Sequence, residues 1–154
     1  MLSVFAAFLG RALLVALFLP FSALDKVLNF NEALSQAEQR TPGKWTAAVL
    51  VASGLGIEVF MSLAILTGVL DRLAAVILAG YCIITALLWK QFWTIRGFRL
   101  SGPQTDRGPF WDFLKNIALA GGFLLFAFGT DSAGVRHFFA DPLTSSHPYS
   151  QGQP

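Results

Sequence analysis

Long apolar blocks alternate with shorter polar connections along this chain. The blocks cover approximately residues 2–24, 45–70, 73–93 and 110–129. Each approaches the roughly 20 residues that a helix needs to cross a hydrocarbon core about 30 Å thick. The pattern predicts an all-α fold, an integral membrane antiparallel four-helix bundle over residues 1–130, followed by a weakly ordered polar tail over residues 131–154.

The first block also has features of a secretory signal peptide. Arg11 precedes an apolar run, and the small pair Ser22-Ala23 follows that run. However, the ten residues before Arg11 are themselves apolar, and no soluble domain comes after the block. We therefore expect the first block to be retained as a membrane span.

The first connection contains a predicted short helix. Asn31 is a candidate N-cap, and Thr41-Pro42-Gly43 ends the helix after Arg40. Apolar residues three or four apart predict that one face rests on the membrane surface, and a solvated loop is the alternative. These residues are Val27, Phe30, Leu34 and Ala37.

The other two connections have different characters. The second is predicted to consist of Asp71-Arg72 alone, which makes spans two and three a tight antiparallel hairpin. The third, Thr94 to Pro109, combines arginines with glycines and prolines and is typical of an irregular cationic loop.

Composition supports the membrane assignment and excludes one class of partner. Hydrophobic residues make up 55% of the chain and charged residues 13%, with a mean hydropathy of +0.60. The net charge is only +2 and the cations are scattered, so no nucleic acid is expected as a partner. The lipid bilayer is the partner that we expect for the apolar surface of the chain.

The distribution of Lys and Arg predicts the orientation. Seven cations flank the first and third connections: Lys26, Arg40, Lys44, Lys90, Arg96, Arg99 and Arg107. Only Arg72 and Arg136 flank the opposite face. The positive-inside rule therefore places those two connections in the cytoplasm and both termini outside.

Two charged residues fall inside the apolar blocks. Counted from the face that carries the N-terminus at about 1.5 Å per residue, Arg11 lies roughly 12 to 15 Å deep and Glu58 roughly 15 Å deep, so their levels match. An isolated charge in lipid costs several kcal/mol, so we expect the two to pair. The pair either lines a pocket for a ligand or proton, or only fixes the register of the helices.

The fourth span adds Asp112, Lys115 and Asn116 in its first turns, on one helical face. We expect these side chains to converge on the Arg11–Glu58 region, although Lys115 can instead extend to the interface. An interfacial aromatic belt explains the aromatic residues near the span ends, which are Trp45, Trp89, Phe92, Trp93, Phe110 and Trp111.

Several kinds of redox site are excluded by the residues that the chain lacks. Cys82 is its single cysteine, so it has neither an intrachain disulfide nor a Cys-x-x-Cys motif. Both histidines follow the last block, which excludes a bis-histidine haem inside the bundle. No metal site and no intrinsic cofactor are expected, so a bound carrier would have to handle any electrons.

The chain resembles the DoxX family of small four-helix membrane proteins from Gly10 to Gly129. The residues that carry the resemblance are Gly10-Arg11 with Asp25-Lys26, Glu58 followed by Leu70-Asp71-Arg72-Leu73-Ala74-Ala75, then Phe92-Trp93, and finally residues 113–122. Many relatives have a histidine two residues before the Phe-Trp pair, where this chain has Lys90.

The resemblance implies a multi-pass protein of the bacterial inner (cytoplasmic) membrane. Some members are similar to subunits of a thiosulfate:quinone oxidoreductase, others are linked to oxidative-stress complexes with soluble redox enzymes, and distant relatives act in assembly or cargo handling. The family therefore implies a fold more firmly than an activity.

Three functional hypotheses follow. The first is an accessory or quinone-linked subunit of a membrane redox system, with a bound quinone and a soluble redox or membrane protein partner; any enzymatic activity would depend on that partner. The candidate ligand or proton site is Arg11, Glu58, Lys115 and Asn116, with Lys26, Arg72, Lys90, Trp93 and Asp112 as secondary candidates. The second hypothesis is a non-catalytic membrane scaffold or assembly factor. The third is a small-solute or proton carrier in which Glu58 titrates.

Overall fold

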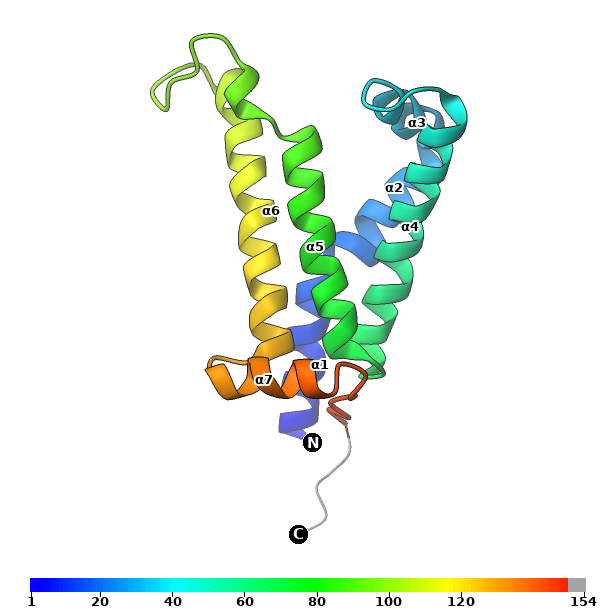
Figure 1. Ribbon diagram of the computed structural model, residues 1–154, viewed down its shortest axis with the longest axis vertical. Helices are drawn as coiled ribbons and strands as arrows, with labels where there is room; N and C mark the ends of the chain where they lie inside the picture. The colour runs from blue at the N-terminus through cyan, green and yellow to red at the C-terminus, as the bar shows by residue number, and fades with distance from the viewer. Residues whose placement is uncertain (150–154) are drawn as a thin grey trace.

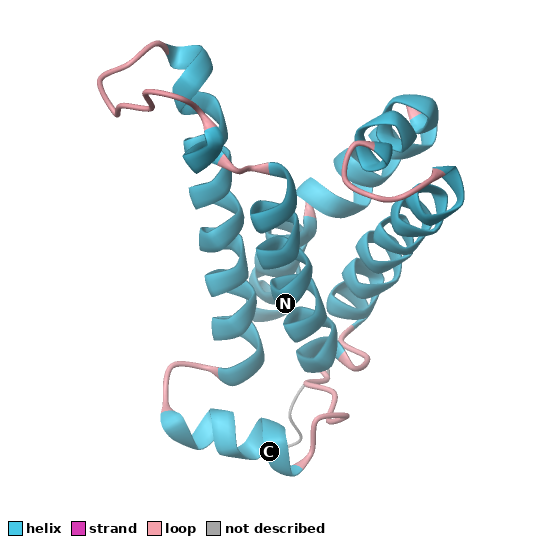
Figure 2. Ribbon diagram, turned by 45° about the horizontal axis from the view of Figure 1, so that its top comes forward, coloured by secondary structure: helices cyan, strands magenta, loops and turns pink. Residues whose placement is uncertain are grey.

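The computed structural model describes residues 1–149, and every regular element in that part of the chain is a helix (Figures 1 and 2). Three helices are long and apolar enough to cross a membrane: α4 (Lys44–Thr67), α5 (Asp71–Trp89), which continues toward a short 3-10 turn at Phe92–Thr94, and α6 (Gln104–Phe128). The all-helical membrane fold is confirmed at this level.

The first block forms a bent pair of helices rather than one straight span. Helix α1 (Leu2–Val15) is followed by a π-helical segment, Leu17–Ser22, and by α2 (Ala23–Leu28), and the axis bends by 42°. Pro20 lies inside the π-helical segment, where it has no N–H to donate to the preceding turn. If the pair is counted as one span, the protein has a fourth.

The long helices expose apolar side chains outward. In each of the three long helices, only 17 to 33% of the most apolar 18-residue stretch is buried inside the protein. Large side chains such as Leu13, Phe60 and Leu125 are more than half exposed. Helices with satisfied backbones and apolar outer surfaces are suited to hydrocarbon rather than water.

The interior is built from small residues and a few large ones. Helices α5 and α6 lie side by side along their length (Figure 1), with Ala75 and Ala79 of α5 and Ala120 and Ala127 of α6 buried in the shared core. The fully buried Phe123 fills the space beside them. Small residues let the two backbones approach closely, which favours packing in lipid.

The hairpin between α4 and α5 is tight, as predicted, but its bounds differ from the expected residues 70 and 73. Gly68 adopts a left-handed conformation (φ 78°), and its N–H donates to the carbonyl of Ala64. This ends α4 at Thr67. Residues 68–70 therefore form the connection, and Asp71 and Arg72 belong to the first turn of α5.

The predicted short helix in the first connection exists as α3 (Phe30–Glu38), which ends before Thr41-Pro42-Gly43. The predicted N-cap is wrong, because the helix begins one residue before Asn31 and the cap position is Asn29. Of the predicted apolar face, Ala37 is buried against α4, whereas Val27 and Phe30 are exposed.

The helix of the fourth apolar block starts earlier than predicted. Helix α6 begins at Gln104 rather than at residue 110, so the irregular part of the third connection shortens to residues 95–103. Pro109 lies inside the second turn of α6. A proline is best tolerated close to a helix start, where few backbone donors are lost.

The tail is more structured than the sequence indicates. Helix α7 (Ser132–Ala140) is capped at its N-terminus by Asp131, whose side chain accepts a hydrogen bond from the backbone N–H of Gly134. Phe138 is buried against Phe128 at the end of α6. Residues 150–154 of the expected weakly ordered tail lie outside the described residues.

Candidate functional site

Helices α2, α3 and α4 diverge from α5 and α6 (Figure 1), and residues of these five helices line a cleft that contains buried polar groups. The cleft has a volume of about 530 Å³. Apolar side chains from several helices form its walls, among them Leu17, Phe18, Leu50, Ile57, Ile84 and Trp89. An apolar cleft of this size with a few polar groups is typical of small-molecule sites.

Glu58 of α4 lies at the centre of the polar part of the cleft. Its carboxylate is 2% exposed and pairs with Lys26, whose Nζ lies 2.8 and 3.0 Å from the two carboxylate oxygens. The hydroxyls of Ser22 and Tyr81 also donate to Oε1, at 2.9 and 2.8 Å. Three donors thus surround one buried carboxylate.

The helix geometry explains how these groups meet. Ser22 and Lys26 are four residues apart, on one face of the chain that follows the bend in the first span, and Lys26 donates to Ser22 Oγ at 2.6 Å. Gly54 precedes Glu58 by one turn, and a Cβ at this position would lie 3.3 Å from the Tyr81 hydroxyl. The glycine therefore leaves room for Tyr81 beside the carboxylate.

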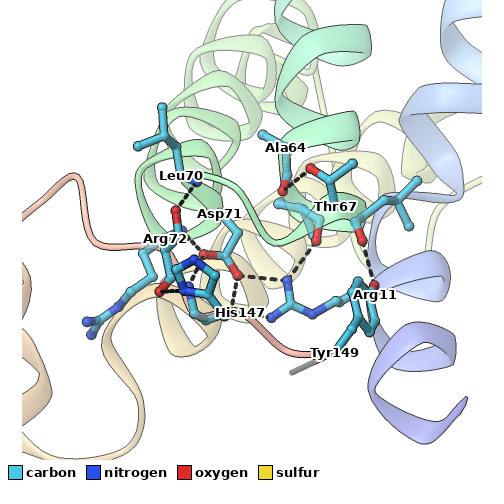
Figure 3. A network of polar contacts seen from close by, with 12 residues as sticks. Arg11, Ala64, Thr67, Leu70, Asp71, Arg72, His147 and Tyr149 are labelled. Carbon is cyan, nitrogen blue, oxygen red and sulfur yellow. Dashed lines mark hydrogen bonds and ion pairs between the residues drawn. The ribbon is translucent and has the colours of Figure 1, made fainter. Parts of the chain in front are cut away.

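The predicted Arg11–Glu58 pair is wrong. Arg11 is buried at the other end of the bundle, where its NH1 lies 2.7 Å from Asp71 Oδ2 and donates to the carbonyl of Ile65 at 2.7 Å (Figure 3). The guanidinium carbon also lies 4.7 Å from the ring centre of Phe126. Arg11 and Glu58 therefore have separate partners.

Arg11 and Glu58 do not meet because α1 and α4 begin at different depths. The N-terminus of α1 extends past the turn between α4 and α5 (Figure 1). Arg11 consequently reaches the level of Ile65, which is seven residues, or about 10 Å of helix, beyond Glu58. The estimate from sequence placed the ends of both helices at the same level.

The tail covers the Arg11–Asp71 pair. Ser146 donates to Asp71 from both its backbone N–H and its hydroxyl, and it accepts a hydrogen bond from Arg11 NH2 at 2.7 Å. Ser145 accepts from the N–H of Leu70 at 2.8 Å, and the Tyr149 hydroxyl donates to the carbonyl of Leu66. These contacts satisfy the buried pair within the protein and favour a structural role for it.

The polar residues of α6 do not converge on Arg11. Asn116 lines the cleft and donates to the backbone carbonyl of Asp112 at 2.9 Å. The Lys115 side chain is 73% exposed and lies 3.5 Å from Asp112, while Lys90, which also lines the cleft, lies 3.2 Å from the same carboxylate. Lys115 and Asp112 belong to a separate outer groove.

Two secondary candidates lie away from the cleft. Arg72 is at the opposite end, where its Nε donates to the carbonyl of Ala127 at 2.8 Å and its NH1 lies 3.0 Å from the ring nitrogen of His137. Trp93 is half exposed and packs edge-on against Phe92 and Phe113. Both contribute to packing between elements.

Sequence reasoning missed Ser22 and Tyr81. The four-residue spacing of Ser22 and Lys26 was a usable signal once the chain was known to remain helical through Pro20. Tyr81 is a polar aromatic residue in the interior of an apolar block, where a hydroxyl needs a hydrogen-bond partner.

The sequence model of the DoxX family matches residues 6–91, which is more than half of the chain. The matched segment contains Ser22, Lys26, Glu58 and Tyr81, whereas Asn116 lies beyond it. No curated protein and no solved structure matches the chain significantly.

Proposed function

The chain belongs to the DoxX family, and from that premise we propose that it is a quinone-binding accessory subunit of a membrane redox system. In this proposal the bent first span and the three long helices form an antiparallel four-helix bundle in the bacterial inner membrane. The observation that carries the proposal is the Lys26–Glu58 pair inside an apolar cleft.

The chemistry of the cleft suits a quinone. A quinone has an apolar ring and tail, with carbonyl oxygens that accept hydrogen bonds. The Lys26 ammonium, with three N–H groups, is a donor at the polar end of the cleft, and Phe18 and Ile57 offer apolar surface nearby. Because the carboxylate of Glu58 balances the ammonium, the site can hold a neutral ligand without an uncompensated charge.

The residues of the cleft can also handle protons. When bound, a quinone accepts two electrons and two protons as it is reduced to the quinol, and a redox partner protein delivers the electrons. Lys26 would supply one of these two protons to a ligand oxygen, and it is hydrogen-bonded to Ser22 and Glu58. Water that enters from the open end of the cleft would supply the second proton and return one to Lys26.

The open end of the cleft is the proposed docking side for a soluble redox partner. The exposed Arg96 and Arg99 lie in the connection at this end, which the positive-inside rule places in the cytoplasm. Exposed cations increase the rate of association with an acidic partner surface.

Purification from the native membrane in mild detergent, followed by extraction and mass spectrometry, tests the proposal. We expect wild-type protein to retain a quinone, and Lys26→Gln and Glu58→Gln to lose it. Lys44→Gln and Glu32→Gln are matched controls, because both residues are exposed and lie outside the cleft lining. Equal quinone content in all five proteins, or none in any, contradicts the proposal.

A membrane scaffold is the second candidate function. It is favoured by the Arg11–Asp71 pair, which the tail already satisfies without a ligand, and by the exposed cationic connection. A wild-type protein that contains no quinone but co-purifies with a partner, and loses that partner in Arg96→Gln/Arg99→Gln, would favour the scaffold.

A further inference from the structure

A second polar groove lies on the outer surface of α6, apart from the cleft. It has a volume of about 450 Å³ and is lined by Gln104, Arg107, Gly108, Trp111, Asp112 and Lys115. These residues recur at three- and four-residue intervals, so they share one face of the helix. The groove therefore runs along the first three turns of α6.

The groove has an excess of positive charge. Asp112 is its one acidic lining residue, and Lys90 and Lys115 lie 3.2 and 3.5 Å from that carboxylate. Arg107 adds a further cation, and its Nε atom is buried without a hydrogen-bond partner among the described residues. Because buried N–H groups in proteins normally have an acceptor, the Arg107 Nε–H indicates a place where an acceptor can bind.

The position of the groove places it at headgroup depth. Helix α6 has 25 residues and is therefore about 38 Å long, which exceeds a hydrocarbon core of about 30 Å. The half-exposed Trp111 ring, which belongs to the groove, is suited to the boundary between headgroups and acyl chains. Gly108 adds no side chain between Arg107 and Trp111.

We propose that this groove binds the phosphate group of an anionic phospholipid. Arg107 donates to the phosphate oxygens, the exposed ammonium of Lys115 approaches the same headgroup, and Trp111 packs against the glycerol and the first acyl carbons. A guanidinium is well suited to phosphate because its donors match two oxygens at once. The proposal concerns lipid recognition and does not depend on quinone binding in the cleft.

Native mass spectrometry of the purified protein with added phosphatidylglycerol or phosphatidylcholine tests the inference. We expect wild-type protein to retain phosphatidylglycerol in preference to phosphatidylcholine. Arg107→Gln/Lys115→Gln should weaken phosphatidylglycerol binding roughly thirty-fold, and Lys115→Gln alone roughly five-fold, from the usual contribution of a cation near an anionic membrane. Lys115→Gln keeps the test decisive if the double variant misfolds, because Lys115 is exposed.

A matched double control removes one exposed lysine and one exposed arginine elsewhere, as Lys44→Gln/Arg136→Gln. It should bind phosphatidylglycerol as wild type does. Equal retention of the two lipids by wild type, or the same loss in the control as in the groove variants, would overturn the inference. Inorganic phosphate is added to lipid-free protein in a separate experiment. If it raises the melting temperature as much as phosphatidylglycerol does, the groove binds free phosphate and the proposal of a lipid ligand is overturned.

Discussion

At the scale of single residues, the interior of α4 carries a polar side chain with no evident partner. Ser62 follows Glu58 by one turn, is fully buried, and its hydroxyl makes no hydrogen bond with any described residue. A buried hydroxyl without a partner lowers stability relative to an apolar group of similar size.

Ser62→Ala should therefore raise the free energy of unfolding by about 1 kcal/mol. Unfolding in mixed micelles, followed by circular dichroism, measures the change. Ser53→Ala is the control, because the Ser53 hydroxyl is exposed and donates to the carbonyl of Leu50. A clear loss of stability in Ser62→Ala would mean that this hydroxyl has a partner we have not identified.

Arg11 should be energetically coupled to the buried carboxylate of Asp71 but not to that of Glu58. Removing either Arg11 or Asp71 leaves a buried charge without its partner, so each single variant should lose about 3 to 5 kcal/mol. Arg11→Met/Asp71→Asn should lose much less than the sum. Arg11→Met/Glu58→Gln should be additive, because these two residues have separate partners. A strong Arg11–Glu58 coupling in the same unfolding assay would restore the pair expected from sequence.

At the scale of elements, the attachment of the tail to the α4–α5 hairpin depends on Gly68. Its φ of +78° is unfavourable for other residues, and a Cβ there would lie 2.3 Å from Pro148 Cδ. By contrast, a Cβ at Gly80 on α5 would meet no atom within 4 Å.

Gly68→Ala should lower stability by about 1 to 2 kcal/mol from the left-handed backbone alone and should detach the tail. Chymotryptic cleavage within residues 143–149 should then become faster, while Gly80→Ala should cleave at the wild-type rate. An unchanged cleavage rate in Gly68→Ala would show that the hairpin does not hold the tail.

The apolar pattern was sufficient to predict the membrane-spanning blocks and the short α3, but not α7, the bend in the first span or the relative depths of the helices. The membrane class, the short α3 and the hairpin were predictable because they depend on local hydropathy and on polar interruptions such as Asp71-Arg72. The depth of α1 relative to α4 depends on packing between helices, whereas Pro20 locates a bend in the first span without giving its direction. The partners of Arg11 and Lys26 therefore could not be read from spacing alone.

The tail shows a second limit of sequence reasoning. Its polar composition suggests solvation, yet Ser145 and Ser146 are the hydrogen-bond partners of the hairpin and of the buried Arg11–Asp71 pair. Short polar side chains satisfy buried charges in three dimensions without any periodic signal.

At the scale of the whole molecule, the two ends of the bundle differ. One end is closed by α7 and the tail, and Ser146 of the tail satisfies the Arg11–Asp71 pair (Figures 1 and 3). At the other end the helices separate around the cleft that holds Lys26 and Glu58. We expect this difference if the end covered by the tail stabilises the fold and the end with the cleft binds the ligand.

The most direct test of the central claim is an equilibrium titration of the protein in nanodiscs with a short-chain quinone, followed by tryptophan fluorescence. Trp89 lines the cleft, so bound quinone should quench its emission saturably, and Trp89→Phe should remove most of the quenching. Loss of a charged hydrogen-bond donor should raise Kd about ten-fold or more in Lys26→Gln, whereas Glu32→Gln should leave Kd unchanged. Quenching that does not saturate, or the same Kd in wild type, Lys26→Gln and Glu58→Gln, would contradict the account.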